Sequence, residues 1–214
     1  MTDMSSQELW DELYSEQDHV WSGAPNHALT VEVADLAPGR ALDVGCGEGA
    51  DAVWLARRGW AVTGVDPSTV ALGRARRQGA DARVDVDWRH GVLADLDLPG
   101  AGFDLVSAFY AVLPRETDPV PRLVSLVAPG GTLLVVHHDM VGDGHGHGDH
   151  EHGDPVDEPD PRFDHEALVM PDEVAAALGD GWTVHGPELR DRVIDGGRGG
   201  HHVRDVVVRA VRRA

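Results

Sequence analysis

A short apolar stretch followed by a glycine-rich turn constrains the fold more than any other feature of this sequence. Arg40–Val44 is predicted to be a buried strand, and the turn Gly45-Cys46-Gly47-Glu48-Gly49 follows it directly. Glycine at alternate positions lets the backbone turn sharply and lets a ligand approach it closely, because no Cβ atom intervenes. Residues 51–58 are then predicted to form a helix that ends at Gly59. This order is typical of the first unit of an open α/β sheet.

The rest of the chain alternates apolar strand segments with helical segments. Such alternation indicates an open sheet with right-handed crossovers. Near the C-terminus two strands follow each other so closely that we expect them to pair antiparallel, as a hairpin. The predicted fold class is α/β: a Rossmann-like open sheet, mostly parallel, with a C-terminal antiparallel hairpin. The predicted strands cover residues 60–65, 83–89, 103–108, 132–137, 182–194 and 201–209, and the predicted helices cover residues 68–78 and 171–178.

The first 36 residues differ from this pattern. Ser5-x-x-Glu8 matches a capping box, and it precedes a helix with Trp10 and Tyr14 on one face. Residues 21–25 interrupt that helix, and Asn26 is placed to cap a second helix that extends to residue 34. We therefore expect an N-terminal helical lid at residues 1–36. The α/β domain is expected at 37–214, with a His/Asp/Gly-rich insertion at 140–165.

Composition and charge exclude several classes of protein. Hydrophobic residues make up 42% of the 214 residues, as expected of a globular chain, and the formal net charge of −19 would repel a nucleic-acid backbone. The polar, acidic N-terminus does not match a signal peptide, and no apolar run reaches the roughly 20 residues of a membrane span. The single Cys46 excludes an internal disulfide. We expect a cytoplasmic protein that acts on a small molecule, with no nucleic acid or membrane as partner.

Two acidic residues accompany the glycine turn and indicate the kind of ligand. Asp66 closes the next strand, where its carboxylate can accept hydrogen bonds from the vicinal hydroxyls of a ribose. Asp43 precedes the turn, whose G-x-G-x-G spacing differs from the G-x-G-x-x-G of dinucleotide sites. This spacing with its leading acid resembles motif I of class I S-adenosylmethionine-dependent methyltransferases. The resemblance extends from Trp10 to Arg213.

The resemblance implies a cofactor site for S-adenosylmethionine. In this family the leading acid and the turn hold the methionyl part, and the second acid holds the ribose. Val92 stands where the family often has an acid for the adenine amino group, so a backbone group or Asp95 would have to replace that acid. Cys46 is interpreted as a small packing residue of the turn. Because ligand-paired carboxylates titrate low, we expect cofactor binding to survive from pH 7 to pH 5. The predicted cofactor residues are Trp21, Asp43, Gly45, Cys46, Gly47, Asp66, Val92, Leu93 and Phe109.

The N-terminal segment indicates one group within this family. Trp10, Tyr14 and the stretch Trp21-Ser22-Gly23-Ala24-Pro25 resemble the short lid of the tellurite-resistance and thiopurine-methyltransferase-like group, whose members act on small molecules. Trp21 would close over the cofactor and keep the pocket dry, or these aromatic residues would simply cover the edge of the sheet. The predicted activity is methyl transfer from S-adenosylmethionine to a small-molecule acceptor.

A catalytic base is needed only for some acceptors. An alcohol or phenol must lose a proton, whereas a soft anion such as a thiolate needs no base. His138 leaves the fifth predicted strand at the expected active-site edge, so it is the candidate base, or else it makes only structural hydrogen bonds. Tyr110, Arg192 and His202 are further candidates for the substrate pocket.

A histidine-rich stretch within residues 140–165 suggests a second kind of site. Two H-x-H pairs, His145 with His147 and His150 with His152, can each chelate a metal ion in an extended chain, and the ligand type suits Zn, Ni, Co or Cu. The same stretch is also interpreted as a solvated acidic loop or as a lid over the pocket. The alternative function is therefore a metal-binding or metal-sensing protein that retains the methyltransferase fold.

Overall fold

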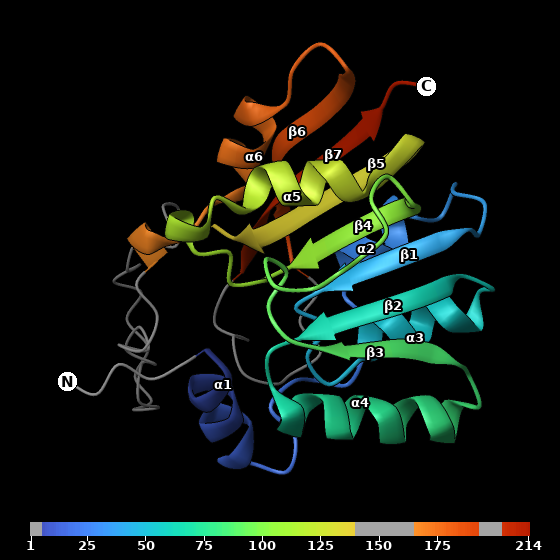
Figure 1. The fold of residues 1–214 in the computed structure, drawn as a ribbon, viewed down its shortest axis with the longest axis vertical. Helices are drawn as coiled ribbons and strands as arrows, with labels where there is room; N and C mark the ends of the chain where they lie inside the picture. Colours follow the sequence, from blue (N-terminus) through green and yellow to red (C-terminus); the bar gives the residue numbers. More distant parts are fainter. Residues whose placement is uncertain (1–5, 140–164, 193–202) are drawn as a thin grey trace.

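A mixed sheet organises the part of the chain that the computed structural model describes, residues 6–139, 165–192 and 203–214. Its strands are β1 (Arg40–Val44), β2 (Ala61–Asp66), β3 (Val86–His90), β4 (Phe103–Phe109), β5 (Val127–His138), β6 (Trp182–Asp191) and β7 (Arg204–Arg212). They lie in the order β3-β2-β1-β4-β5-β7-β6 (Figure 1). The first five strands run parallel, and β7 is antiparallel to both β5 and β6. The predicted fold class is confirmed.

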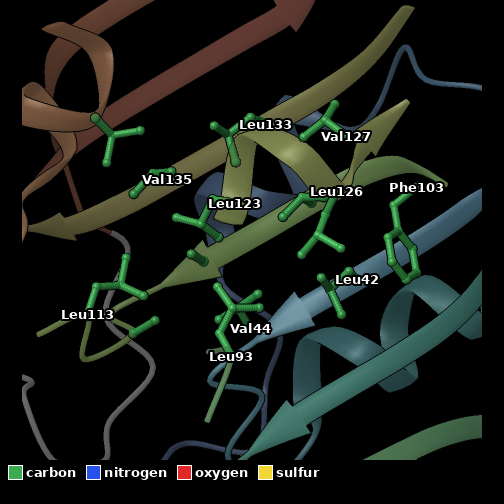
Figure 2. Close-up of a cluster of buried hydrophobic side chains, with 14 of the residues drawn as sticks. Leu42, Val44, Leu93, Phe103, Leu113, Leu123, Leu126, Val127, Leu133 and Val135 are labelled. Atoms are coloured by element: carbon green, nitrogen blue, oxygen red, sulfur yellow. The ribbon is translucent and has the colours of Figure 1, made fainter. Parts of the chain in front are cut away.

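Helices cover both faces of the sheet (Figure 1). Alternate residues of β5 point to opposite faces, so Leu133 packs on one face and Leu134 on the other. The face of Leu133 carries a cluster that includes Leu123 and Val174, shown in part in Figure 2. The described helices are α1 (Ser6–Ser15), α2 (His27–Glu32), α3 (Ala50–Arg57), α4 (Thr69–Ala82), α5 (Pro119–Leu126) and α6 (Pro171–Ala177), with short 3₁₀ turns η1 (Arg115–Thr117) and η2 (His165–Ala167).

Some predicted details of the secondary structure are wrong. Helix α5 was not expected, because its prolines at 119 and 121 disguise a helix start, where proline is tolerated. The side chain of Asn26 makes no capping hydrogen bond to α2 and instead donates to Asp51 at 2.7 Å. Strand β5 begins at Val127, not at residue 132. Local patterns place elements well but miss such boundaries.

The direction of the strands determines where a site can form. Because β1, β2, β4 and β5 are parallel, their carboxyl ends meet at one edge of the sheet, and α1 lies near this edge (Figure 1). Strand β7 runs in the opposite direction, so it begins at the same edge and places Asp205 opposite His138. Ligands of open α/β sheets bind at the carboxyl ends of the strands.

Candidate methyl-transfer site

The glycine turn of residues 45–49, between β1 and α3, has a backbone conformation that favours glycine. Gly45, Gly47 and Gly49 have φ angles of 72°, 51° and 91°. The amide of Gly45 donates to the carbonyl of Val65 at 2.8 Å, which attaches the turn to the end of β2. A Cβ atom at Gly47 would lie 2.8 Å from Tyr14 Oη. A side chain at Gly47 would therefore collide with the hydroxyl of Tyr14, so the close approach of Tyr14 to the turn requires glycine here.

Asp66, the last residue of β2, connects the glycine turn to the start of α4. Its Oδ2 accepts a hydrogen bond from the amide of Gly47 at 2.8 Å, and its Oδ1 accepts one from the amide of Ser68 at 2.8 Å. The side chain is buried, and this burial raises its pKa to about 6. A carboxylate held in this way has further lone pairs that can accept hydrogen bonds from a ligand.

Asp43 is the second buried acid of this region. The hydroxyl of Ser107 donates to its Oδ1 at 3.3 Å, whereas its Oδ2 has no hydrogen-bond partner within the described residues. Burial, followed by the negative charge of Asp51, raises the pKa of Asp43 well above its usual range. A buried polar atom without a partner is costly. Asp43 Oδ2 therefore fits a donor group that a ligand would supply, such as an ammonium.

The glycine turn and both acids line one cavity of about 330 Å³. This volume lies within the usual range for small-molecule sites, roughly 300–1,000 Å³. The structure brings all the predicted cofactor residues to its wall. These residues are Trp21, Asp43, Gly45, Cys46, Gly47, Asp66, Val92, Leu93 and Phe109.

Two aromatic residues of the N-terminal segment lie over the glycine turn. Trp21 Nε1 donates to Tyr14 Oη at 2.9 Å, and the two rings meet edge to face with centroids 6.5 Å apart. Tyr14 is buried, and this burial raises its pKa well above its usual range, so its hydroxyl stays protonated. Trp21 is 37% exposed. Both residues line the cavity.

A buried ion pair holds this segment in place. Glu48, in the glycine turn, accepts hydrogen bonds from the amide of Trp21 at 3.1 Å and from Arg74 Nη1 at 2.7 Å. Arg74 also donates to the carbonyls of Tyr14 and Gln17, each at 2.6 Å. The side chains of Glu48 and Arg74 are 7% and 12% exposed. The turn therefore determines the position of the aromatic pair as well as the shape of the cavity.

Another group of polar side chains, the Asp205 cluster, consists of Tyr110, His138, Arg192 and Asp205. Tyr110 Oη donates to Asp205 Oδ2 at 2.8 Å, and His138 Nδ1 lies 3.3 Å from Asp205 Oδ1. Arg192 Nε lies 3.5 Å from the same oxygen. The rings of Tyr110 and His138 stack with centroids 4.2 Å apart. Tyr110, His138 and Arg192 also line the cavity, so this cluster and the glycine turn contribute to one site.

Comparison with known proteins agrees with this geometry. The sequence matches the family model of a methyltransferase domain over residues 41–131. It is 39% identical over 123 residues to an uncharacterized methyltransferase of Mycobacterium tuberculosis, covering 56% of this chain and 61% of that protein. It is 35% identical over 109 residues to a ubiquinone biosynthesis O-methyltransferase of Marinobacter nauticus, covering 49% and 46%. The chain thus spans about half to three fifths of these relatives.

Solved structures share the whole architecture. A structure from a study of the conversion of a disulfide bond into a thioacetal in echinomycin biosynthesis has a TM-score of 0.73 at 23% identity, covering 98% of this chain and 93% of that one. The N-methyltransferase NodS of Bradyrhizobium japonicum, in complex with S-adenosyl-L-homocysteine, has a TM-score of 0.68 at 17% identity, covering 98% and 100%. Residues 41–131 thus match a methyltransferase domain, and the chain shares the fold of these solved structures.

A structure from the tellurite-resistance group, to which the N-terminal segment was predicted to be similar, shares the fold of this chain. TehB of Haemophilus influenzae has a TM-score of 0.64 at 14% identity, and the match covers 97% of this chain and 68% of TehB. At this identity the likeness concerns the fold alone.

Several predicted residues of the methyltransferase domain have a clear place in the structure. Cys46 is buried, and this burial raises the pKa of its thiol well above its usual range, as expected of a packing residue and not of a nucleophile. Asp95 is exposed and does not line the cavity, so it is a poor replacement for the missing adenine acid. The wall at this position consists of Val92, Leu93 and Ala94, where backbone groups remain available.

Burial of Asp66 bears on the expected pH behaviour of this site. Cofactor binding was expected to survive from pH 7 to pH 5 because paired carboxylates titrate low. In the unliganded protein, however, burial raises the pKa of Asp66 to about 6. Protonation of the free protein then competes with binding within that range.

Other features of the site were missed at the level of sequence. Nothing in the sequence pattern distinguishes Asp205 or Arg74 from other charged residues, because their partners lie far away in the chain. Glu48 could have been noticed, since it stands within the glycine turn at the start of a helix.

The predicted metal ligands His145, His147, His150 and His152 lie outside the described residues, as does His202. Within the described ranges, no group of three or more His, Cys, Asp or Glu side chains is arranged to hold a metal ion. Across those same ranges, none of the helices has the length and apolar character needed to cross a membrane.

Proposed function

We propose that this protein transfers the methyl group of S-adenosylmethionine to a small-molecule acceptor. The observation that carries the proposal is the partnerless Asp43 Oδ2, which lines the same cavity as the glycine turn and Asp66. An ammonium group would satisfy this oxygen, and ribose hydroxyls would donate to Asp66. The matched methyltransferase region, residues 41–131, contains the turn and both acids. Names of relatives and structural neighbours include both an O- and an N-methyltransferase, so they leave the acceptor atom open.

The residues of this chain would position the acceptor against the cofactor and would exclude water from the site. The bound cofactor supplies a methyl group on a positively charged sulfur, which becomes neutral in the transfer. The protein therefore needs to align acceptor and donor and to exclude water, without a nucleophile of its own. Tyr14 and Trp21, which are hydrogen-bonded to each other and line the cavity, would exclude water over the glycine turn. For an acceptor that must lose a proton, His138 is the candidate base at the cavity wall.

Calorimetric titration with S-adenosyl-L-homocysteine tests the proposal. We expect one molecule to bind per chain. Asp66→Ala should weaken this binding by about 1–3 kcal/mol, because charge-assisted hydrogen bonds are lost. Asp81→Ala removes an exposed carboxylate from α4 and is the matched control, with unchanged affinity expected. Absence of binding by the parent protein, or equal affinity in the Asp66 variant, would show that the site is misplaced.

The metal-binding alternative and the cytoplasmic location stay predictions from the sequence. Titration with Ni²⁺ and Zn²⁺ separates the alternative from the main proposal, because a metal protein needs a saturable site of defined stoichiometry. A metal-sensing role would require such a site in addition to, and not in place of, the cofactor site.

A further inference from the structure

We propose that Asp205 is a positioning residue that orients His138 as the proton acceptor of the methyl transfer, and that the methyl acceptor is therefore a hydroxyl group. This inference rests on the proposed function and makes its substrate class more specific. It starts from the Asp205 cluster, which joins residues that are distant in the sequence at one part of the cavity wall.

The register of the sheet places the two residues directly opposite each other. His138 ends β5, Asp205 lies at the start of β7, and the two are paired across the antiparallel ladder. Their side chains therefore stand on the same face of the sheet, and both are largely buried, with 15% and 7% exposed. An ionised carboxylate can only accept hydrogen bonds, so the contact at 3.3 Å requires a proton on His138 Nδ1. In the neutral ring the lone pair is then on Nε2.

The partners of Asp205 hold its carboxylate in one orientation. Tyr110 donates to one oxygen at 2.8 Å, and Arg192 and His138 approach the other. The guanidinium of Arg192 also lies over the ring of Tyr110, at 5.2 Å from its centroid. Tyr110 itself has a φ of 51°, which is unusual for a bulky residue, and its ring stacks against that of His138. Such strain is common where a functional side chain must be held in one orientation.

Among the described residues, the other members of the cluster and the neighbouring His137 are unsuited to accept the proton. Burial and the negative charge of Asp205 raise the pKa of Tyr110 far above its usual range, so Tyr110 remains a donor. Arg192 is a permanent cation. His137, on the same strand, is buried with its ring centroid 5.6 Å from that of His138, and it does not line the cavity. The carboxylate of Asp205 already receives the donors of Tyr110, His138 and Arg192. His138 is the group of this cluster that combines a basic nitrogen with a place on the cavity wall.

The arrangement matches the needs of a hydroxyl acceptor. The hydroxyl proton passes to His138 Nε2, the oxygen forms a bond to the methyl carbon, and the bond between that carbon and the sulfur breaks. The sulfur keeps the electron pair and becomes neutral, so the positive charge is transferred to the imidazolium beside Asp205. A thiolate has already lost its proton and would gain nothing from this base.

The tautomer of His138 provides a test that needs no known substrate. In ¹⁵N-histidine-labelled protein with S-adenosyl-L-homocysteine added, His138→Gln identifies the signals of His138. We expect the neutral ring to be protonated at Nδ1 in the parent protein and to shift towards the Nε2-protonated form in Asp205→Ala. Asp191→Ala, an acid-to-alanine change at an exposed position of the same hairpin, should leave the tautomer unchanged. If the alanine variant does not fold, Asp205→Asn should give a mixture of both forms. The proposal is overturned if the ring in the parent protein is protonated at Nε2. It is also overturned if both Asp205 variants show the same tautomer as the parent.

Two probe acceptors test the substrate class. 3,4-Dihydroxybenzoate presents hydroxyls, and 2-nitro-5-thiobenzoate presents a thiolate. His138→Gln should slow methyl transfer to the first probe by about 100-fold or more, and transfer to the second should be unchanged. Methylation of the thiolate alone, or equal slowing with both probes, overturns the hydroxyl assignment. Failure of the proposed function is a different result: the parent protein would then not bind S-adenosyl-L-homocysteine in calorimetry, whatever the tautomer of His138.

Discussion

The glycine-turn end of the cavity comes from one continuous stretch, residues 43–66, whereas the Asp205 cluster draws on four separate places in the chain. Gly47 and Asp66, which share a hydrogen bond, are 19 residues apart. Tyr110 and Asp205 are 95 residues apart, and His138 and Asp205 are 67 apart. A local motif therefore builds the first end, and strand order and register build the second.

The two ends also differ in how well their polar atoms are satisfied. Asp43 Oδ2 has no partner within the described residues, and burial raises the pKa of both Asp43 and Asp66. The carboxylate of Asp205, in contrast, already receives donors from its neighbours. Within the described residues, the glycine-turn end thus keeps a buried oxygen without a donor, whereas the carboxylate of Asp205 is held by donors from the protein. The following changes test that difference.

The largest effect is expected at the glycine-turn end, from Gly45→Val. The residue has a φ of 72°, and its Cβ would lie 3.1 Å from that of Ala111. Strain and steric conflict together should weaken S-adenosyl-L-homocysteine binding by about 4 kcal/mol, close to 1,000-fold, as measured by calorimetry. Far-UV circular dichroism should remain that of the folded parent, because Gly45 belongs to neither face of the core. Gly73→Ala in α4 has room for its methyl group and is the control.

A smaller but still large effect is expected where the N-terminal segment meets the glycine turn. Arg74→Ala would leave the buried Glu48 without its arginine partner and would remove the donors to the carbonyls of Tyr14 and Gln17. Loss of one partner of a buried pair typically costs about 3 kcal/mol or more. Thermal unfolding should show this loss, and cofactor affinity should fall with it. Arg76→Ala changes an exposed arginine of the same helix, so a similar loss in this variant would contradict the assignment.

The next largest effect is a pH dependence of cofactor affinity, which should arise at the glycine-turn end. Ribose hydroxyls favour the ionised Asp66, whose pKa in the free protein is about 6. Affinity should therefore be constant above pH 6 and fall by about tenfold per pH unit below it. Folding of the unliganded protein should respond in the opposite sense. Because burial raises the pKa of the folded state above that of the unfolded chain, this group adds stability as the pH falls through 6. Calorimetry and thermal unfolding from pH 7.5 to pH 5 measure both trends, and an affinity that stays flat to pH 5 would contradict them.

The smallest effect on either end is expected from the histidine-rich stretch. Replacing His145, His147, His150 and His152 together by Ser should leave the melting temperature and the cofactor affinity nearly unchanged, because this stretch has few apolar residues to pack. Any Ni²⁺ or Zn²⁺ binding should disappear in this variant, and in the parent it should be lost between about pH 7 and pH 5 as imidazoles are protonated. A fall of several degrees in the melting temperature of the metal-free protein would show that the stretch belongs to one of the two ends.

The sequence by itself determined the parts of this protein that depend on local rules. Positive φ angles favour glycine, so the turn at residues 45–49 could be recognised directly, and apolar runs separated by helices predicted the parallel sheet. Asp43 and Asp66 could be placed at the carboxyl edge because each lies at or near the end of a strand next to that turn.

Only the tertiary structure decided which distant residues complete the site. Asp205 meets His138 because β7 pairs with β5 in antiparallel register, and Arg74 reaches Glu48 because α4 packs beside the glycine turn. Neither pairing has a local signature, since any of many charged residues would satisfy the same pattern along the chain. The raised pKa of Asp66 likewise arises from burial, which the surrounding elements create together. Torsional preference is encoded residue by residue, whereas partners and solvent exclusion exist only after the chain has folded.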